Sequence, residues 1–146
     1  MRPFLRGRGG RTATVAGFSM IEVLIVMIII GILTAIAIPM YLGQRDRAKN
    51  AVARAGGRQI AVALLSYVTD SSADDPWPSQ CDSATLSMYV DAGQWPKNAF
   101  DPGMPMHTVT SRSLGDYLYE RETTGPSPRP YHLAVFLKNQ ADFVVP

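Results

Sequence analysis

The sequence predicts an α+β protein in which a long N-terminal α-helix packs, over its second half, on a small antiparallel β-sheet. An apolar run covers residues 18–38, and helical spacing of apolar and small residues continues to residue 67. Short segments of alternating apolar residues fill the C-terminal third. The pattern divides the chain into four parts: a basic leader at 1–17, an apolar helix at 18–39, an amphipathic helical half at 40–69 and a globular head at 70–146.

The leader holds four arginines and no acidic residue, whereas the whole chain has 14 Lys and Arg against 12 Asp and Glu. Without the leader the balance is slightly acidic. Nucleic-acid binding through bulk charge is therefore not supported, and DNA is a possible partner only. An arginine-rich flank before an apolar helix is more typical of a topology signal that keeps the N-terminus in the cytoplasm.

The apolar helix is long enough to cross a membrane. Residues 18–38 would rise about 32 Å as an α-helix, which matches the hydrocarbon thickness of a bilayer. Glu22 lies near the start of this run, where a charged group costs at least about 2.5 kcal/mol on insertion scales. Such a residue is expected to have a charge partner and a function.

The letters GFSMIE at residues 17–22, followed by VLIVMIIIGILTAIAIP, resemble the class III signal of type IV pilins and pseudopilins. In that family a membrane prepilin peptidase cuts after the glycine, here Gly17, and N-methylates the new first residue, here Phe18. The resemblance implies that Glu22 acts in filament assembly by pairing with the terminal amine of a neighbouring subunit. Cleavage would create an amine one helical turn from Glu22, and such a pair would specify axial register.

Gly31 and Pro39 fall where the same family has a helix glycine and a helix proline. Pro39 has no N–H and clashes with the carbonyl of Ala35, so we expect a helix kink or local melting that Gly31 and Thr34 help to absorb. The alternative is that the helix ends at Pro39. Helical spacing resumes directly after Pro39, which favours the kink.

Two other interpretations of the apolar run stay open. The basic flank, the run itself and the residues Ala35-Ile36-Ala37 imitate a secretory signal peptide with an A-x-A cleavage site. The run is longer than the usual core of such a signal and contains Glu22, and both features count against this interpretation. A plain single-pass anchor is the second alternative.

Residues 40–69 predict an amphipathic helix with one face buried against the head. The predicted buried positions are Ala48, Val52, Ala55, Ile60, Ala63, Leu64 and Tyr67. Basic residues at 45–58 fall largely on the opposite face, where a solvated surface is favoured over a binding patch. The pair Gly56-Gly57 weakens the helix by roughly 1 kcal/mol per glycine relative to alanine, and is either a close-packing point or a flexible joint.

After the helix, a Ser-, Asp- and Pro-rich stretch predicts a surface loop. An acidic cluster in and around it invites a calcium hypothesis; its members are Asp70, Asp74, Asp75 and Asp82. The cluster lacks the glycine and final glutamate of an EF-hand loop, so a solvated acidic loop is favoured.

Cys81 is the single cysteine, so it cannot form an internal disulfide. We expect an ordinary small side chain there rather than a reactive or intermolecularly paired thiol. Residues 83–93 then predict one short helix, capped by Ser83 and stopped at Gly93. The proline-rich residues 94–106 predict an irregular surface segment whose Trp95 and Phe100 enter the core.

Four short antiparallel strands are predicted in the last part of the chain. They cover residues 107–111, 116–121 and 131–139, with residues 142–146 as a final edge, and a proline-rich hairpin loop spans 122–130. This order is similar to the C-terminal sheet of many bacterial pilins. The single cysteine departs from the disulfide-bounded loop of many pilins, and the head lacks the acidic calcium motif of the major type II secretion pseudopilin.

Nothing in the sequence predicts an enzyme, a metal site or a cofactor. The two histidines, His107 and His132, lie in predicted strands beside polar or small residues, and surface positions explain them better than catalysis. A zinc site from both histidines and Cys81 lacks any ligand pair with close motif spacing.

The predicted function is that of a structural subunit of a type IV pilus-like filament, processed by a prepilin peptidase and assembled through its N-terminal helix. Alternatives are a pseudopilin of a type II secretion or DNA-uptake system, and a plain anchored or secreted binding domain. The resemblance implies other subunits, the peptidase, an inner-membrane platform protein and an assembly ATPase as partners, and membrane lipid before assembly. It also implies a single pass through the bacterial inner membrane, with the N-terminus cytoplasmic, before an extracellular or periplasmic filament forms.

Overall fold

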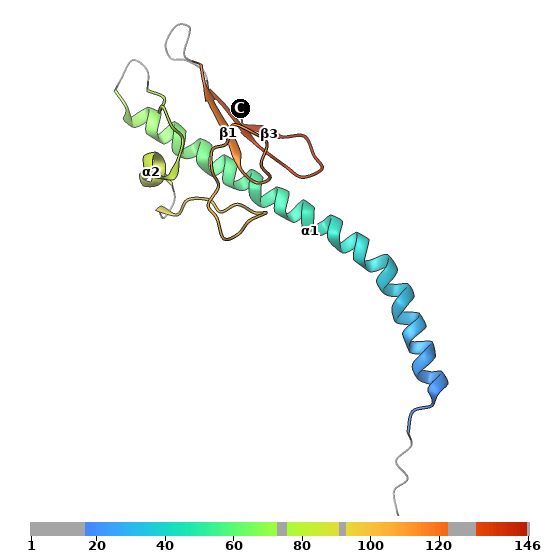
Figure 1. Ribbon diagram of the computed structural model, residues 1–146. Helices are drawn as coiled ribbons and strands as arrows, with labels where there is room; N and C mark the ends of the chain where they lie inside the picture. Colours follow the sequence, from blue (N-terminus) through green and yellow to red (C-terminus); the bar gives the residue numbers. More distant parts are fainter. Residues whose placement is uncertain (1–16, 73–75, 91–92, 123–130, 146) are drawn as a thin grey trace, which may run out of the picture. The chain divides into compact units, whose positions relative to one another are not determined.

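A computed structural model describes residues 17–72, 76–90, 93–122 and 131–145 (Figure 1). Its elements are the helix α1 (Met20–Asp70), the short helix α2 (Ser83–Leu86), the 3-10 helix η1 (Ser87–Tyr89) and the strands β1 (Tyr117–Arg121), β2 (Tyr131–Val135) and β3 (Phe143–Val145). The chain forms two compact units, one up to Met40 and one from Tyr41 onward, and α1 runs across their boundary. The predicted α+β fold, with a long N-terminal helix and a small antiparallel sheet, is confirmed.

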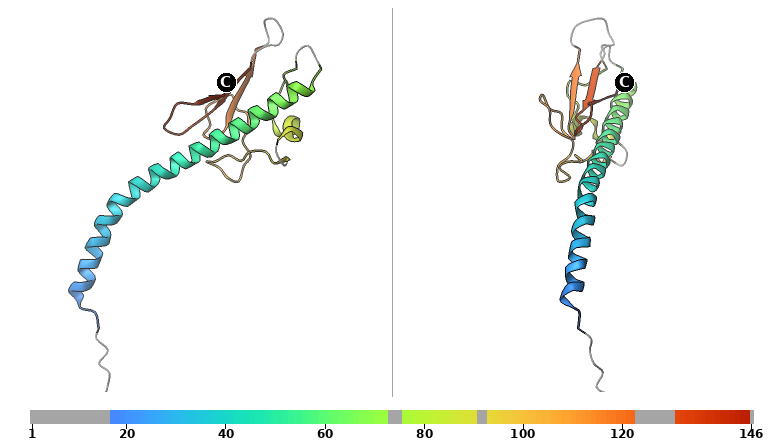
Figure 2. Two further views of the ribbon diagram at one scale, coloured as in Figure 1. Left: turned by 180° about the vertical axis from the view of Figure 1, so that it is seen from behind. Right: turned by 90° about the vertical axis from the view of Figure 1, so that its right-hand side faces the viewer.

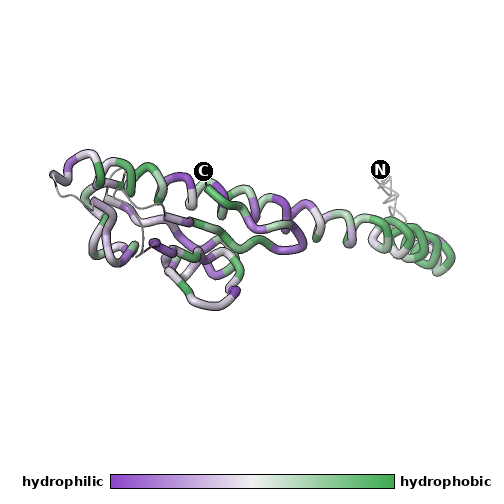
Figure 3. Tube along the Cα trace, turned by 90° about the horizontal axis from the view of Figure 1, so that it is seen from above, coloured by the Kyte–Doolittle hydropathy of each residue, from purple (hydrophilic) through white to green (hydrophobic). Residues whose placement is uncertain are grey.

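The first half of α1 is apolar on every side (Figure 3). All described residues from 17 to 45 are exposed. The helix is long and apolar enough to cross a membrane, and no part of its most apolar stretch is buried. It also continues through Pro39, so the alternative that the helix ends there is wrong.

The second half of α1 is buried on one face, and the sequence predicted this face only in part. The buried residues are Asn50, Ala53, Gly56, Gly57, Ile60, Ala61, Ala63 and Leu64. Burial of Ile60, Ala63 and Leu64 is confirmed, and Tyr67 packs at the edge of the core. The prediction for Ala48, Val52 and Ala55 is wrong because these residues are exposed. They form a second stripe with helical spacing, and the head packs on the stripe that carries the glycines.

Gly56 and Gly57 form a close-packing point rather than a joint, since α1 passes through them without a break. A Cβ on Gly56 would lie 2.5 Å from Sδ of Met106, and a Cβ on Gly57 would collide with Cγ2 of Val135. The missing side chains therefore let β2 and the segment that contains Met106 approach the helix backbone.

The sheet has the order β1-β2-β3 and is antiparallel throughout. Tyr117 pairs with Val135, and Leu133 pairs with both Tyr119 and Val145. Tyr117, Leu133 and Val135 are fully buried. Figure 2 shows the sheet beside the second half of α1 in two views. The predicted strands at 116–121 and 131–139 and the final edge at 142–146 are confirmed, with shorter bounds.

The predicted strand at 107–111 is wrong. This segment touches β1 at one residue only, through a parallel bridge between Thr108 and Tyr117. The N–H of Val109 donates to the Tyr117 carbonyl at 2.9 Å, and the N–H of Tyr117 donates to the His107 carbonyl at 3.1 Å. Thr108 and Thr110 are exposed and Val109 is half-buried, so the alternation reflects a surface segment that pairs with the edge strand β1 at Thr108 only.

The short helix after the loop is confirmed, but its predicted cap is wrong. Oδ1 of Asp82, not the Ser83 hydroxyl, accepts the N–H of Thr85 at 2.8 Å. This hydrogen bond lowers the pKa of the Asp82 carboxyl. The helix tightens into η1 after Leu86 and ends at Tyr89, before Gly93, whose φ of 64° lies in the left-handed region that favours glycine.

Two buried asparagines fix irregular backbone to the core. Nδ2 of Asn50 donates to the Lys138 carbonyl at 2.8 Å, and Oδ1 of Asn50 accepts the Lys138 N–H at 3.0 Å. Asn98 donates to Oδ1 of Asp116 at 2.9 Å and accepts the N–H of Phe100 at 2.8 Å. Each amide satisfies backbone groups that have no strand partner, which buried polar groups require.

Trp95 and Phe100 are both half-buried and lie at the edge of the core. The prediction that they enter the core is therefore confirmed only in part. Nε1 of Trp95 donates to the Met106 carbonyl at 2.8 Å, and the Trp95 ring packs against the buried cluster. The Phe100 ring lies under the Lys49 ammonium, 5.4 Å from Nζ to the ring centroid.

Substitution of Gly57 tests the close packing of α1. We expect Gly57→Ala to destabilise the head, because overpacking costs about 1–3 kcal/mol and exceeds the gain in helix propensity of about 0.5–1 kcal/mol. Gly43→Ala is the matched control, since a Cβ there meets nothing within 4 Å. It should be neutral or slightly stabilising. Urea unfolding of the detergent-solubilised chain, followed by the fluorescence of its two tryptophans, measures both effects. Equal effects of the two substitutions would contradict the packing account.

Candidate functional site

The predicted cleavage junction lies in exposed chain just before α1. Gly17 and Phe18 are both outside the helix, which begins at Met20, and Phe18 is 82% exposed. A Cβ on Gly17 would meet nothing within 4 Å, so local crowding is not what requires a glycine there. Exposed non-helical chain is the substrate that a peptidase needs. The rest of the predicted leader, residues 1–16, lies outside the described residues.

Ser19 caps α1, and this places Glu22 in the first turn of the helix. The N–H of Glu22 donates to Oγ of Ser19 at 3.2 Å and to the Ser19 carbonyl at 3.1 Å. Ser19 and Glu22 therefore have the spacing of a capping box, and a carboxylate in the first turn is favoured by the helix dipole. This capping role was not among the predictions from sequence, although the S-x-x-E letters that signal it are present.

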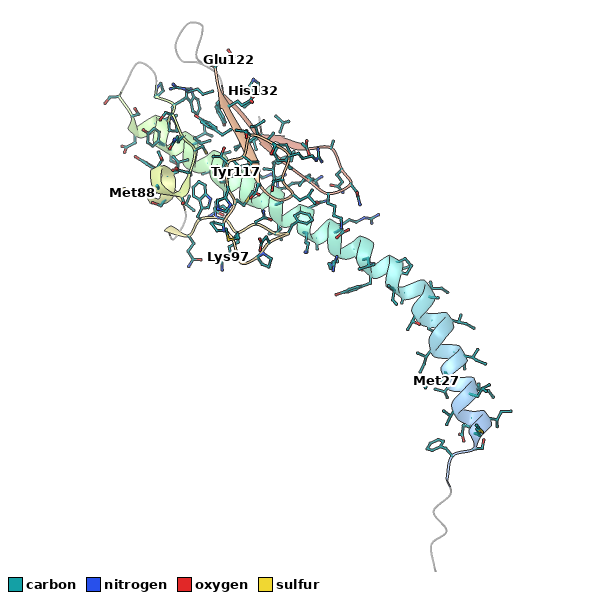
Figure 4. All side chains as sticks on the ribbon, in the orientation of Figure 1. Met27, Met88, Lys97, Tyr117, Glu122 and His132 are labelled. Carbon is teal, nitrogen blue, oxygen red and sulfur yellow. The ribbon has the colours of Figure 1, made fainter. Side chains whose placement is uncertain are left out.

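Glu22 is the one charged side chain between residues 17 and 44. It lines a shallow groove whose other walls are apolar, formed by Phe18, Val23, Val26, Met27 and Ile30. The apolar side chains on this part of α1, including the labelled Met27, are exposed and project outward from the helix (Figure 4). A continuous apolar surface of this size marks a membrane or a protein partner.

Cleavage after Gly17 would change the electrostatics of this site. The new α-amino group on Phe18 has an ordinary pKa near 8, so it would be mostly cationic at neutral pH. It would lie four positions, or about one helical turn, before Glu22. The ion pair between this amine and Glu22, within one chain or between neighbouring copies, stays a prediction.

Gly31 and Pro39 lie inside α1, as the sequence predicts, but their role in a kink stays a prediction. The Thr34 hydroxyl donates to the carbonyls of Ile30 at 2.8 Å and Gly31 at 3.0 Å. Such hydrogen bonds to the preceding turn often bend helices.

Cys81 is a core side chain. It is free and fully buried, and the Tyr117 hydroxyl donates to its carbonyl. Burial raises the pKa of the Cys81 thiol to about 12, and burial also raises the pKa of the Tyr117 hydroxyl well above its ordinary value. The structure therefore agrees with the prediction of an ordinary small side chain.

The histidines and the acidic cluster do not converge. Nδ1 of His107 lies 3.8 Å from Oδ1 of Asp116, and His132 lies on β2 opposite Glu120. Asp70 accepts the Tyr89 hydroxyl at 2.9 Å, whereas Asp74 and Asp75 lie outside the described residues. Within the described ranges, no three His, Cys, Asp or Glu side chains are placed to hold a metal ion.

Comparisons with known proteins found two similarities to parts of this chain. The family model described as the prokaryotic N-terminal methylation motif matches residues 13–38. Over 58 residues the chain is 40% identical to the type II secretion system core protein G of Pseudomonas aeruginosa. That match covers 40% of this chain and 41% of the relative, so the chain spans about two fifths of the curated protein it matches. No solved structure matches.

These findings confirm the resemblance to the type IV pilin and pseudopilin family. The matched motif contains the predicted cleavage junction, Glu22 and most of the apolar helix. The resemblance rests on this N-terminal segment and on the identity to a core protein G of a type II secretion system. The segment has the features of a membrane anchor, since it is apolar and long enough to span a bilayer.

The burial of Cys81 predicts an unreactive thiol. In the folded chain we expect almost no alkylation by iodoacetamide between pH 8 and 10, because a thiol with a pKa of about 12 holds its proton there. In urea the thiol should react quickly. The same shift predicts that stability is unaffected below pH 9 and falls between pH 9 and 12, where only the unfolded thiol ionises. Cys81→Ala should make this fall shallower. Alkylation of the folded chain at the unfolded rate would contradict the account.

Proposed function

We propose that this chain is a structural subunit of a type IV pilus-like filament, assembled through the N-terminal half of α1. The observation that supports the proposal most directly is a methylation motif at the start of an uncovered apolar helix with one carboxylate in its first turn. An uncovered helix of this kind needs lipid before assembly and other subunits after it. Its role is structural rather than catalytic.

The proposed order of events follows from the site. The arginine-rich leader stays in the cytoplasm and the apolar helix crosses the membrane. A prepilin peptidase cuts after Gly17 and methylates Phe18. When the helix leaves the lipid and joins a bundle, the amine of one subunit pairs with Glu22 of its neighbour. An unpaired buried charge costs about 3–5 kcal/mol, so the axial offset that forms the pair is strongly preferred over other offsets.

The proposed mechanism requires several protein partners. The proposal requires other subunits, which are copies of this chain or relatives, together with the prepilin peptidase. An inner-membrane platform protein and an assembly ATPase supply the movement, since the sequence has no phosphate-binding loop of its own. The subunit moves from the inner membrane into an extracellular or periplasmic filament.

A second candidate is a pseudopilin of a type II secretion system. The 40% identity to core protein G of such a system favours it, over two fifths of each chain. The two candidates share the cleavage, the methylation and the helical packing, and differ in where the filament ends. A pseudopilin would form a short periplasmic structure, whereas a pilin would yield filaments that can be sheared from the cell.

The mature N-terminus tests the proposal against ordinary secretion. Mass spectrometry of the chain, purified from membranes of its native host, should show a chain that begins at N-methylated Phe18. A secretory signal peptide would instead give a chain that begins at Ile38, after the A-x-A site.

A matched substitution makes this test sharper. Ala37→Leu removes the A-x-A site and leaves Gly17 intact, so we expect the same methylated Phe18 terminus. A chain that keeps Met1, or that starts at Ile38 and is lost in the Ala37→Leu variant, would overturn the proposal.

A further inference from the structure

The head carries a groove with a basic rim and an apolar floor. It has a volume of about 350 Å³ and lies between α1 and the segment 97–102. Arg45, Lys49 and Lys97 surround it, and Ala48, Val52 and Pro102 line it. Val52 is 57% exposed, although it is an apolar residue in the folded head. The groove therefore offers an apolar contact surrounded by positive charge.

A second exposed feature of the head combines a protruding apolar side chain with negative charge. Met88 lies on η1 and is 90% exposed, the highest value among the exposed large apolar side chains of the head (Figure 4). Two carboxylates are connected to this part of the fold. The Tyr89 hydroxyl holds the Asp70 carboxylate at 2.9 Å, and Asp82 caps α2 immediately before η1. Methionine is flexible and adapts to irregular apolar surfaces.

The charges on the two features are complementary. Within the described part of the chain, neither Asp70 nor Asp82 forms an ion pair, and Lys97 also forms none. The Arg45 guanidinium lies 3.7 Å from Asp46, whose other oxygen binds Lys138 at 2.9 Å. Each feature is thus apolar at its centre and carries unmatched charge at its edge.

One copy cannot bring the two features together. Tyr89 of η1 lines a hollow with Arg58 and Val62, and its hydroxyl donates to Asp70, so η1 lies beside the last turns of α1 from about Arg58 onward. The groove meets α1 earlier, between Arg45 and Val52. Figure 4 shows Met88 and Lys97 at separate places on the head. A contact between the features therefore joins different copies, and because the two surfaces differ it can repeat without closing.

We propose that Met88 of one copy inserts into the groove of the next copy, with Asp70 and Asp82 facing Arg45, Lys49 and Lys97. The inference rests on the proposed filament function and adds a head-to-head partner surface to it. Apolar helices alone give weak orientational preference, whereas complementary charges around an apolar contact fix the order and orientation of neighbours.

Engineered cysteines test the contact in assembled filaments. Met88→Cys together with Val52→Cys places one thiol on each surface, and the native Cys81 is buried and does not interfere. Mild oxidation of filaments in the native host should give a ladder of disulfide-linked dimers, trimers and longer products on non-reducing gels. The matched control pairs Met88→Cys with Val144→Cys on β3, since Val144 is also 57% exposed. The control should give no ladder.

Charge reversal provides a second test that needs no new thiol. Lys97→Glu should lower filament yield about fivefold at low salt, as expected for a change in exposed ion pairs. Asp70→Lys added to Lys97→Glu should restore yield, because the reversed charges are again complementary. Failure of the second substitution to restore yield would overturn the proposal.

The outcomes separate this inference from the proposed function. Filaments of chains that begin at methylated Phe18, without the ladder, would overturn the Met88 contact and leave the filament function standing; a groove occupied by anionic lipid would give this result. Products that stop at dimers would also overturn it, since they indicate a closed symmetric contact. No cleavage at Gly17 and no filament would instead remove the proposed function on which the inference rests.

Discussion

A single carboxylate in an otherwise uncharged helix is the constraint on which this account depends. Glu22 begins an apolar surface whose described residues, 17–40, are all exposed. In lipid or in a helix bundle an unpaired charge there is strongly unfavourable, by about 3–5 kcal/mol when a partner is lost from a buried pair. The Ser19 cap and the helix dipole ease this cost at the start of α1, and an amine on Phe18 would remove most of what remains.

The head is stabilised by a different set of contacts. Gly56 and Gly57 let β2 and Met106 approach the second half of α1, and Asn50 binds the backbone that follows β2. Small residues and a buried amide thus bring the sheet close to α1, and Ile60 and Leu64 add the larger apolar contacts. The stripe left exposed, which includes Val52, is then available for contacts between copies.

The sequence was sufficient for the parts of the structure that local pattern controls. The long helix, its passage through Pro39 and the strands β1 and β2 follow from composition and periodicity. Three predictions failed where tertiary contacts decide. Val52 lies on one of two stripes with equal helical spacing, the segment around Thr108 pairs with β1 at a single bridge only, and Asp82 competed with Ser83 for one cap. The buried amides of Asn50 and Asn98 have no signal in a single sequence, because their partners lie far along the chain.

The central claim is that Glu22 acts through its charge and not only through its place in a capping box. Glu22→Gln in the native host separates the two roles, since glutamine also serves in a capping box but cannot form an ion pair with an amine. Ser19→Ala is the converse variant: it removes a cap worth about 1 kcal/mol and keeps the charge. Filament yield, measured by electron microscopy and by sheared or crosslinked protein, should collapse for Glu22→Gln, although that chain is still inserted and cleaved, and should largely survive for Ser19→Ala. Normal filaments with unchanged axial spacing from Glu22→Gln would contradict the account.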